Sequence, residues 1–240
     1  MDELAIEFKD VYKNYKLYKK TNKKLFSVLF FKNKIKIKKV LNGISFKINK
    51  GESVAIIGKN GMGKSTILKL MLGISYPTSG DIKVLQKIGG ILELDSGFEK
   101  EFTGRENIYL KCEIMGFSKK YIKTIEQDII DFADIGEYID QPIRMYSSGM
   151  RSRLGFAISV FTYPDILLVD EVFSVGDIAF KDKCVKKVNE IIKNKNTTFI
   201  LVTHSCEIAE EFCDRGILIN NGKILFDGDI HECTKTYLNL

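Results

Sequence analysis

The residues best suited to chemistry form one glycine-rich run, Gly58-Lys59-Asn60-Gly61-Met62-Gly63-Lys64-Ser65-Thr66. This run fits the pattern G-x-x-x-x-G-K-[ST], which is typical of a loop that binds phosphate. Glycines let the backbone wrap closely around phosphates, and its N–H groups then point at them from a helix N-terminus. We therefore expect a nucleoside triphosphate site in which Lys64 reaches the β- and γ-phosphates and Ser65 ligates Mg²⁺. The nucleotide-binding residues predicted here are Gly58, Asn60, Gly61, Gly63, Lys64, Ser65 and Thr66.

Three further groups follow apolar runs that are typical of buried strands. Asp170 and Glu171 end the run that starts at residue 165, and His204 follows the run 198–203. The carboxyl ends of parallel strands form the edge of a sheet where ligands bind. We expect Asp170 to hold Mg²⁺ through water and Glu171 to polarise the water that attacks the γ-phosphate. His204 is expected to sense that phosphate through a hydrogen bond, so the predicted catalytic residues are Glu171, His204 and Lys64.

The elements that must position these groups alternate between strand and helix along the chain, which predicts an α/β fold with a largely parallel sheet. Thr103 with Glu106 forms a capping box, and Ser118 is the expected N-cap of a helix with an apolar stripe. The sequence Asn220-Asn221-Gly222 indicates a hairpin. Strands are predicted over 5–11, 40–48, 53–57, 81–85, 88–92, 165–170, 198–203, 216–219 and 223–226. Helices are predicted over 66–72, within 97–133, and over 151–161, 180–192, 207–213 and 230–238.

The composition is that of an ordinary globular protein, with 45% apolar and 28% charged residues in 240. No apolar run is long enough to cross a bilayer. The five cysteines are scattered and form no C-x-x-C pair. We interpret them as reduced thiols of a cytoplasmic protein, outside any metal site.

The net charge of +6 comes from one segment, residues 16–39, which contains ten lysines and no acidic residue. Inside it, residues 25–31 are apolar and aromatic. A short helix with lysines around an apolar face would suit an anionic membrane surface or a groove on a membrane partner. The alternative is an insertion whose aromatic side chains pack on the domain while the lysines stay in water. The aromatic residues are not interleaved with the lysines, so we expect no nucleic-acid partner.

A second motif, Tyr146-Ser147-Ser148-Gly149-Met150, resembles the L-S-G-G-Q signature of ABC transporter ATP-binding subunits. Its place between the phosphate loop and Asp170 also matches that family, as does the position of Asp177 in a D-loop. The resemblance implies ATP and Mg²⁺ as ligands, and a P-loop NTPase fold of the ABC ATPase type. That fold has a mainly parallel central sheet, an N-terminal antiparallel β portion and a helical subdomain. Residues 1–240 would form one such domain, with a core of about 1–92 and 162–228, a helical subdomain of about 97–161 and a short helix over 230–240.

The family resemblance also implies a head-to-tail homodimer. Each ATP would lie between Lys64 of one subunit and the signature residues of the other, which are Ser147, Ser148, Gly149 and Met150. An aromatic residue near the first strand would stack on adenine. Tyr15 matches best in position, with Tyr12 and Tyr18 as alternatives.

Two loops are similar to those of ATPases that export surface polysaccharide. Residues 90–98 and 102–107 resemble the O-antigen exporters, and residues 146–154 also resemble the capsule exporters. Glu93 stands where the family has a Q-loop glutamine, so it either ligates Mg²⁺ or contacts the membrane subunit. The resemblance implies two copies of a membrane permease at the cytoplasmic face of a bacterial inner membrane, and a lipid-linked polysaccharide as cargo. Capsule, teichoic acid or another lipid-linked substrate is the alternative, and a soluble ABC ATPase acting on nucleic acid is a distant one.

Overall fold

The computed structural model describes residues 3–17, 36–91, 97–170, 177–194 and 196–240, with residues 90 and 91 described by their backbone alone. The helix considered for residues 25–31 lies outside these ranges. Within them, no helix has the length and apolar character that a membrane crossing requires.

The larger sheet has six strands in the order β5-β6-β7-β3-β8-β9. The first five are parallel and β9 runs antiparallel to β8, so the predicted largely parallel sheet is confirmed. All five residues of β3 are buried, and β3 pairs with β7 on one side and β8 on the other. Its strands are β3 (Ser53–Ile57), β5 (Ile88–Ile91), β6 (Ile166–Asp170), β7 (Thr198–Thr203), β8 (Arg215–Asn220) and β9 (Lys223–Asp229).

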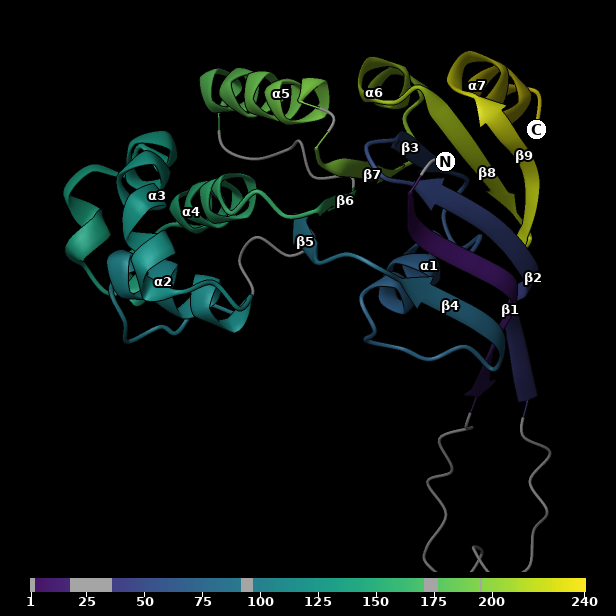
Figure 1. Cartoon of the computed structure of the whole chain (residues 1–240), viewed down its shortest axis with the longest axis horizontal. Helices are drawn as coiled ribbons and strands as arrows, with labels where there is room; N and C mark the ends of the chain where they lie inside the picture. Colours follow the sequence, from purple (N-terminus) through teal and green to yellow (C-terminus); the bar gives the residue numbers. More distant parts are fainter. Residues whose placement is uncertain (1–2, 18–35, 92–96, 171–176, 195) are drawn as a thin grey trace, which may run out of the picture.

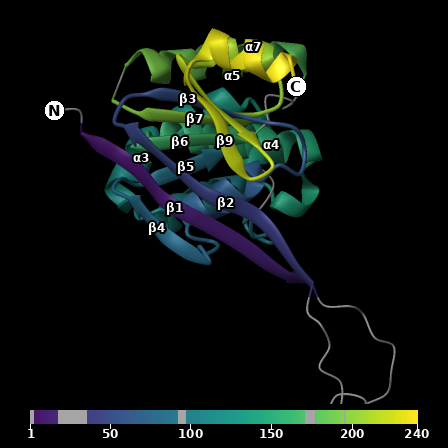
Figure 2. The same cartoon turned by 90° about the vertical axis from the view of Figure 1, so that its right-hand side faces the viewer.

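The smaller sheet is antiparallel, in the order β2-β1-β4. It contains β1 (Leu4–Leu17), β2 (Lys36–Asn49) and β4 (Ser79–Val84). Both β1 and β2 are longer than the predicted strands, because their polar ends are held by pairing across the two strands, from Tyr12 opposite Asn42 to Leu17 opposite Lys36. Figures 1 and 2 show this pair extending beyond the rest of the domain. The two ends of the basic segment 16–39 are therefore strand residues.

The larger sheet separates two apolar cores, because successive side chains of a strand point to opposite faces. Val54 and Ile56 pack with α1 (Lys64–Met71) and the smaller sheet, whereas Ala55 and Ile57 belong to the core on the other face. That second face is covered by α5 (Ile178–Lys193), α6 (Cys206–Phe212) and α7 (Ile230–Leu238), which lie side by side in Figure 1. The parallel strands are thus buried on both faces, which explains their continuous apolar sequence.

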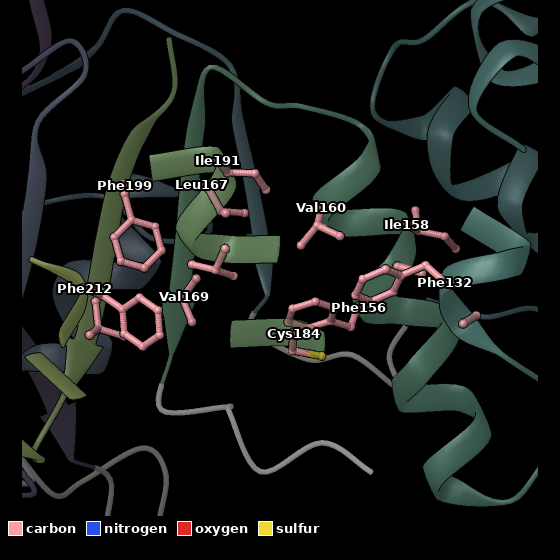
Figure 3. Packing of buried hydrophobic residues seen from close by; sticks show 14 of the residues in the cluster. Phe132, Phe156, Ile158, Val160, Leu167, Val169, Cys184, Ile191, Phe199 and Phe212 are labelled. Atoms are coloured by element: carbon pink, nitrogen blue, oxygen red, sulfur yellow. The ribbon is translucent and has the colours of Figure 1, made fainter. Parts of the chain in front are cut away.

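A helical unit follows β5 and contains α2 (Gly104–Ile114), α3 (Lys119–Ala133) and α4 (Ser148–Phe161), with short 3₁₀ turns at Gly136–Asp140 and Ile143–Met145. The predicted capping box at Thr103 is confirmed, and so are the Ser118 cap and the buried stripe of α3. Phe132 of α3 packs 6.0 Å from Phe156 of α4 and 5.7 Å from Phe180 of α5, measured between ring centroids. Figure 3 shows Phe132 and Phe156 in the core that continues to Leu167 and Val169. This aromatic cluster joins the helical unit to the main sheet.

Asn107 is a fully buried polar residue of α2, and its amide holds the loop that precedes the helix. Its Oδ1 accepts a hydrogen bond from the Glu99 amide at 2.8 Å. Its Nδ2 donates to the carbonyls of Glu99, Phe102 and Thr103 at 3.0, 3.2 and 2.8 Å. One side chain therefore contacts four backbone groups of the loop, and it adds to the backbone hydrogen bonds that the three carbonyls already accept from the Phe102, Ile143 and Asn107 N–H groups.

Replacing Asn107 with Leu should lower the free energy of unfolding by about 1–3 kcal/mol, because a side chain of similar volume removes four hydrogen bonds to the loop, including the one that the Glu99 N–H donates. Urea unfolding of the whole chain measures this change. Gln127→Leu is the matched control, because Gln127 is exposed on α3 and its side-chain amide donates to the Asp131 carboxylate one turn along the same helix. Equal stability losses in the two variants would contradict the assigned role of Asn107.

Candidate nucleotide-binding site

The phosphate loop leaves the carboxyl end of β3 and passes directly over β8. A Cβ added to Gly58 would lie 2.5 Å from the backbone oxygen of Ile219, closer than a real Cβ can approach. Gly63 has φ +116°, a left-handed conformation that favours glycine, and a Cβ there would lie 2.8 Å from Leu41. The predicted strand, loop and helix are confirmed, with α1 beginning at Lys64. Glycine at these positions lets the loop pack tightly between the two sheets.

Lys64 is only 6% exposed although it carries a charge. Its Nζ donates hydrogen bonds to the carbonyl oxygens of Gly58 and, at 3.4 Å, of Lys59. These contacts hold the ammonium group inside the loop. A buried cation at a helix N-terminus, surrounded by loop backbone, is suited to bind an anion such as phosphate.

A cleft of about 580 Å³ opens at this loop. Such a volume lies in the usual range for small-molecule and cofactor sites. The residues that line it include four lysines and, of the described residues, one carboxylate, so its lining is strongly positive and complementary to a polyphosphate. The lining residues are Tyr15, Lys16, Leu17, Lys38, Val40, Asn60, Gly61, Gly63, Lys64, Ser65, Thr66, Lys69 and Asp170.

The cleft brings together most of the residues that the sequence predicted for nucleotide binding. Ser65 from α1 and Asp170 from the carboxyl end of β6 line it together. A hydroxyl and a carboxylate oxygen are the donors that Mg²⁺ prefers, so this pair fits the predicted metal. Gly58 does not line the cleft, because it packs against β8 beneath the loop.

Of the other residues predicted for catalysis or metal binding, the structure describes His204 but not Glu171 or Glu93. His204 directly follows β7, whose last residue, Thr203, pairs with Ile57 at the end of β3. It therefore lies at the same edge of the sheet as the phosphate loop, but it does not line the cleft. Glu171 and Glu93 lie outside the described residues. Their predicted roles stay predictions.

Among the three candidate tyrosines, only Tyr15 is found in the cleft. Tyr12 is on the same strand but packs near Gly43, and Tyr18 lies outside the described residues. The Lys13 ammonium lies 5.1 Å from the centroid of the Tyr15 ring and donates to the Tyr76 carbonyl at 2.6 Å. Lys13 itself does not line the cleft. The geometry favours Tyr15 as the residue that stacks on a base.

Sequence reasoning missed five residues of the cleft: Lys16, Leu17, Lys38, Val40 and Lys69. Lys69 was detectable, because it lies four residues after Ser65 on the same face of α1. Lys16, Leu17 and Lys38 belong to the parts of β1 and β2 that extend beyond the predicted strands, and Val40 is the first residue of the predicted strand 40–48. Their place in the site depends on strand pairing, which no local sequence signal revealed.

The signature residues form a second cluster around a pocket of about 520 Å³, lined by Ser147, Ser148, Gly149, Met150, Ser152, Arg153 and Asp177. Ser147 is the N-cap of α4, and its hydroxyl accepts the Met150 N–H at 3.2 Å. Arg153 donates to the Asp177 carboxylate at 2.6 Å, and the other oxygen of Asp177 caps α5 by accepting the Phe180 N–H at 2.9 Å. This pocket shares no residue with the cleft at the phosphate loop.

Tyr146 fixes the chain just before the signature helix. Its phenol is almost fully buried and donates to the Tyr138 carbonyl at 2.6 Å. Burial raises the pKa of Tyr146 to about 12, so the phenol remains a hydrogen-bond donor at neutral pH. This hydrogen bond ties the position of the α4 N-terminus to the 3₁₀ turn at Gly136–Asp140.

An apolar groove of about 500 Å³ adjoins the cleft and lies between α1, α2 and α4. It shares Ser65, Lys69 and Asp170 with the cleft. Two of its apolar side chains, Ile74 and Ile114, are 69% and 74% exposed. Exposure of large apolar side chains at one groove is typical of a surface that contacts a partner.

A central strand that ends in a phosphate loop, with oxygen donors at the end of a nearby parallel strand, defines the class of P-loop nucleotide-binding proteins. The profile described as ABC transporter matches residues 41–174. The chain belongs to the ABC transporter family, and the prediction of an ABC-type ATPase is confirmed.

Sequence identity to two relatives indicates which ABC transporter proteins the chain resembles. The chain is 40% identical to the O-antigen export system ATP-binding protein RfbB of Klebsiella pneumoniae, with 98% of each chain covered. It is 42% identical to the teichoic acids export ATP-binding protein TagH of Bacillus anthracis, over 97% of this chain but 42% of TagH. The predicted resemblance to the O-antigen and teichoic-acid exporter ATPases is therefore confirmed.

Solved structures agree with the fold. The dimeric ATP-binding cassette MJ0796 with bound ADP and Pi matches with a TM-score of 0.74 at 20% identity, covering 94% of this chain and 98% of that one. An ATP-binding subunit of an ABC transporter matches with a TM-score of 0.77 at 22% identity, covering 97% and 93%. The predicted ABC ATPase fold, with its antiparallel N-terminal sheet and helical part, is confirmed.

Replacing Gly58 with Ala should weaken ATP binding at least about tenfold, because the added methyl group forces the loop away from the Ile219 backbone. Calorimetric titration of the whole chain with ATP measures the change. Circular dichroism serves as the control that the fold is retained. An unchanged dissociation constant in a folded variant would show that the loop does not depend on this close approach.

Proposed function

We propose that this chain is the ATP-hydrolysing subunit of an ABC exporter that moves a lipid-linked polysaccharide outward across the cytoplasmic membrane. The observation that supports it most is the positive cleft that combines the phosphate loop, Tyr15 and Asp170. The polysaccharide cargo follows from the 40% identity to RfbB, whose name states O-antigen export. Because TagH relatives are equally similar, teichoic acid is the second candidate cargo. None of the relatives named above acts on nucleic acid by its name, so that alternative has no support.

The proposed reaction is transfer of the γ-phosphoryl group of ATP to water. The loop backbone and Lys64 hold the phosphates, and Tyr15 stacks on adenine. Ser65 and Asp170 would hold Mg²⁺, which neutralises charge on the phosphates when it is bound. Glu171 accepts a proton from the attacking water, and His204 donates a hydrogen bond to the γ-phosphate. Glu93 is kept as a candidate ligand for the metal or contact for the permease.

The proposed active unit is a head-to-tail homodimer. In one chain, the signature pocket and the phosphate-loop cleft share no residue, so a second copy can bring its α4 N-terminus to the nucleotide. Exposed N–H groups at that helix end, near Ser148 and Gly149, are suited to bind the γ-phosphate. The matching MJ0796 structures are described as dimeric, which supports this assembly.

The proposed membrane partner is a permease in two copies, bound at the cytoplasmic face of the inner membrane. We assign its contact to the apolar groove that exposes Ile74 and Ile114, because this groove adjoins the cleft and shares Asp170 with it. A partner seated there would be close enough to respond to nucleotide. The basic segment 16–39 is a second candidate contact with the permease or the membrane surface.

Replacing Gly149 with Ala should reduce ATP hydrolysis at least about tenfold while leaving ATP affinity unchanged. Inside one chain, a Cβ at Gly149 meets only the Ser147 hydroxyl oxygen, at an ordinary 3.8 Å, so the fold has no reason to change. Its effect therefore reports on contact with the partner's nucleotide. Steady-state ATPase rates and ATP titration measure the two quantities. Full activity in the variant would exclude Gly149 from the proposed dimer interface.

The cargo is tested in the native cell by exchanging Glu171 for Gln, which keeps ATP binding but removes the proposed base. We expect surface polysaccharide to disappear and lipid-linked polysaccharide to accumulate inside, because export then stops after synthesis. Chemical analysis of both fractions identifies the sugar and separates O-antigen from teichoic acid. Normal surface glycan in cells whose variant has lost ATPase activity would reject the polysaccharide proposal.

A further inference from the structure

The extended part of the β1–β2 pair carries residues that face the nucleotide cleft. Tyr15 of β1 pairs directly with Lys38 of β2, and both line the cleft. Residues opposite each other on antiparallel strands point to the same face, with Cβ atoms about 4.5–5.5 Å apart. Lys38 is therefore an immediate neighbour of the ring that we propose to stack on adenine.

Alternation along β2 separates the lysines of the basic segment by direction. Lys38 and Val40 line the cleft, whereas Lys39, between them, does not. Successive side chains of a strand point to opposite faces, which explains the difference on β2, whereas three consecutive residues of β1, Tyr15 to Leu17, line the cleft at the end of that strand. The ten lysines of residues 16–39 therefore do not share one environment, although the sequence suggested a single basic surface.

The charge on Lys38 is not neutralised by any carboxylate in the described part of the chain, since none lies within ion-pair distance of it. Lys13 of β1, by contrast, donates to the Tyr76 carbonyl and contacts the Tyr15 ring. Among the described residues that line the cleft, the carboxylate is Asp170, which we assign to Mg²⁺ with Ser65. An exposed ammonium beside the base site is thus available for an anion.

We propose that Lys38 is a further nucleotide-binding residue, whose ammonium group pairs with the α-phosphate. This inference rests on the proposed ATP site. With adenine on Tyr15 and the β- and γ-phosphates at Lys64, the α-phosphate lies between these two points. A lysine beside Tyr15 has a flexible four-carbon stem that carries a point charge toward that position. Lys38 thereby holds the inner end of the phosphate chain while the loop holds the outer end.

The decisive experiment compares Lys38→Met with Lys39→Met in the full chain. Both variants remove one positive charge from adjacent exposed positions of β2, so they change the net charge equally. Titration of the unaltered chain and both variants with ATP and with ADP gives six dissociation constants, each measured at two salt concentrations. Lys38→Met should raise the constants for ATP and ADP by the same factor of about ten, equivalent to about 1.4 kcal/mol. Lys39→Met should change them less than about twofold, and only Lys38→Met should lower the salt dependence.

Each alternative result has a defined meaning. Equal weakening by both variants would show a general field of the basic segment, and no weakening by either would show a solvated lysine. A loss for ATP but not for ADP would place the ammonium at the γ-phosphate. Any of these results would overturn the proposal for Lys38. If the unaltered chain bound no ATP, or bound it equally well with Lys64→Ala, the proposed function itself would be wrong and the role of Lys38 would fall with it.

Discussion

The structure depends on one constraint, the burial of β3 between β7 and β8. All five residues of β3 are buried and both of its edges are paired, so the point at which the chain leaves this strand is fixed by backbone hydrogen bonds. Gly58 then packs on the Ile219 carbonyl, and only a residue without a side chain permits that approach. The phosphate loop is therefore positioned by the sheet and does not need a ligand to define its course.

A second network ties the smaller sheet to this core. Arg215 at the start of β8 donates to the Lys47 carbonyl of β2, the Glu52 carboxylate and, through two nitrogens, the Asp227 carboxylate of β9. Pairing with Asp227 raises the pKa of Arg215 further, so the group stays charged. Nearer the nucleotide cleft, β2 is tied to the turn between β8 and β9, because the Asn42 N–H donates to the Gly222 carbonyl at 2.8 Å and the Asn42 side-chain amide donates to the Asn221 carbonyl at 3.0 Å.

The sequence was sufficient where local chemistry decides structure. The apolar runs that became β3 and β7 have no other stable place than a buried sheet, and the Thr103 capping box satisfies its helix end locally. It was insufficient where pairing decides: Tyr12 to Leu17 alternate too little in polarity to predict a strand, yet β2 holds them in one. The sequence did not indicate Lys38 as a cleft residue for the same reason. The direction of the Lys38 side chain depends on the register of β1 and β2 and not on its neighbours in sequence.

At the signature pocket, a small number of side-chain contacts joins α4 to the start of α5. The Asp177 carboxylate uses one oxygen to cap α5 and the other to accept from Arg153 of α4. Arg153 also stacks on the Phe180 ring of α5, with its guanidinium carbon 4.9 Å from the ring centroid. A displacement of α4 must therefore either carry the start of α5 along or break this charge-assisted hydrogen bond. In the homodimer proposed above, contact of the partner's nucleotide with the signature residues is thereby linked to the start of α5 through Arg153 and Asp177.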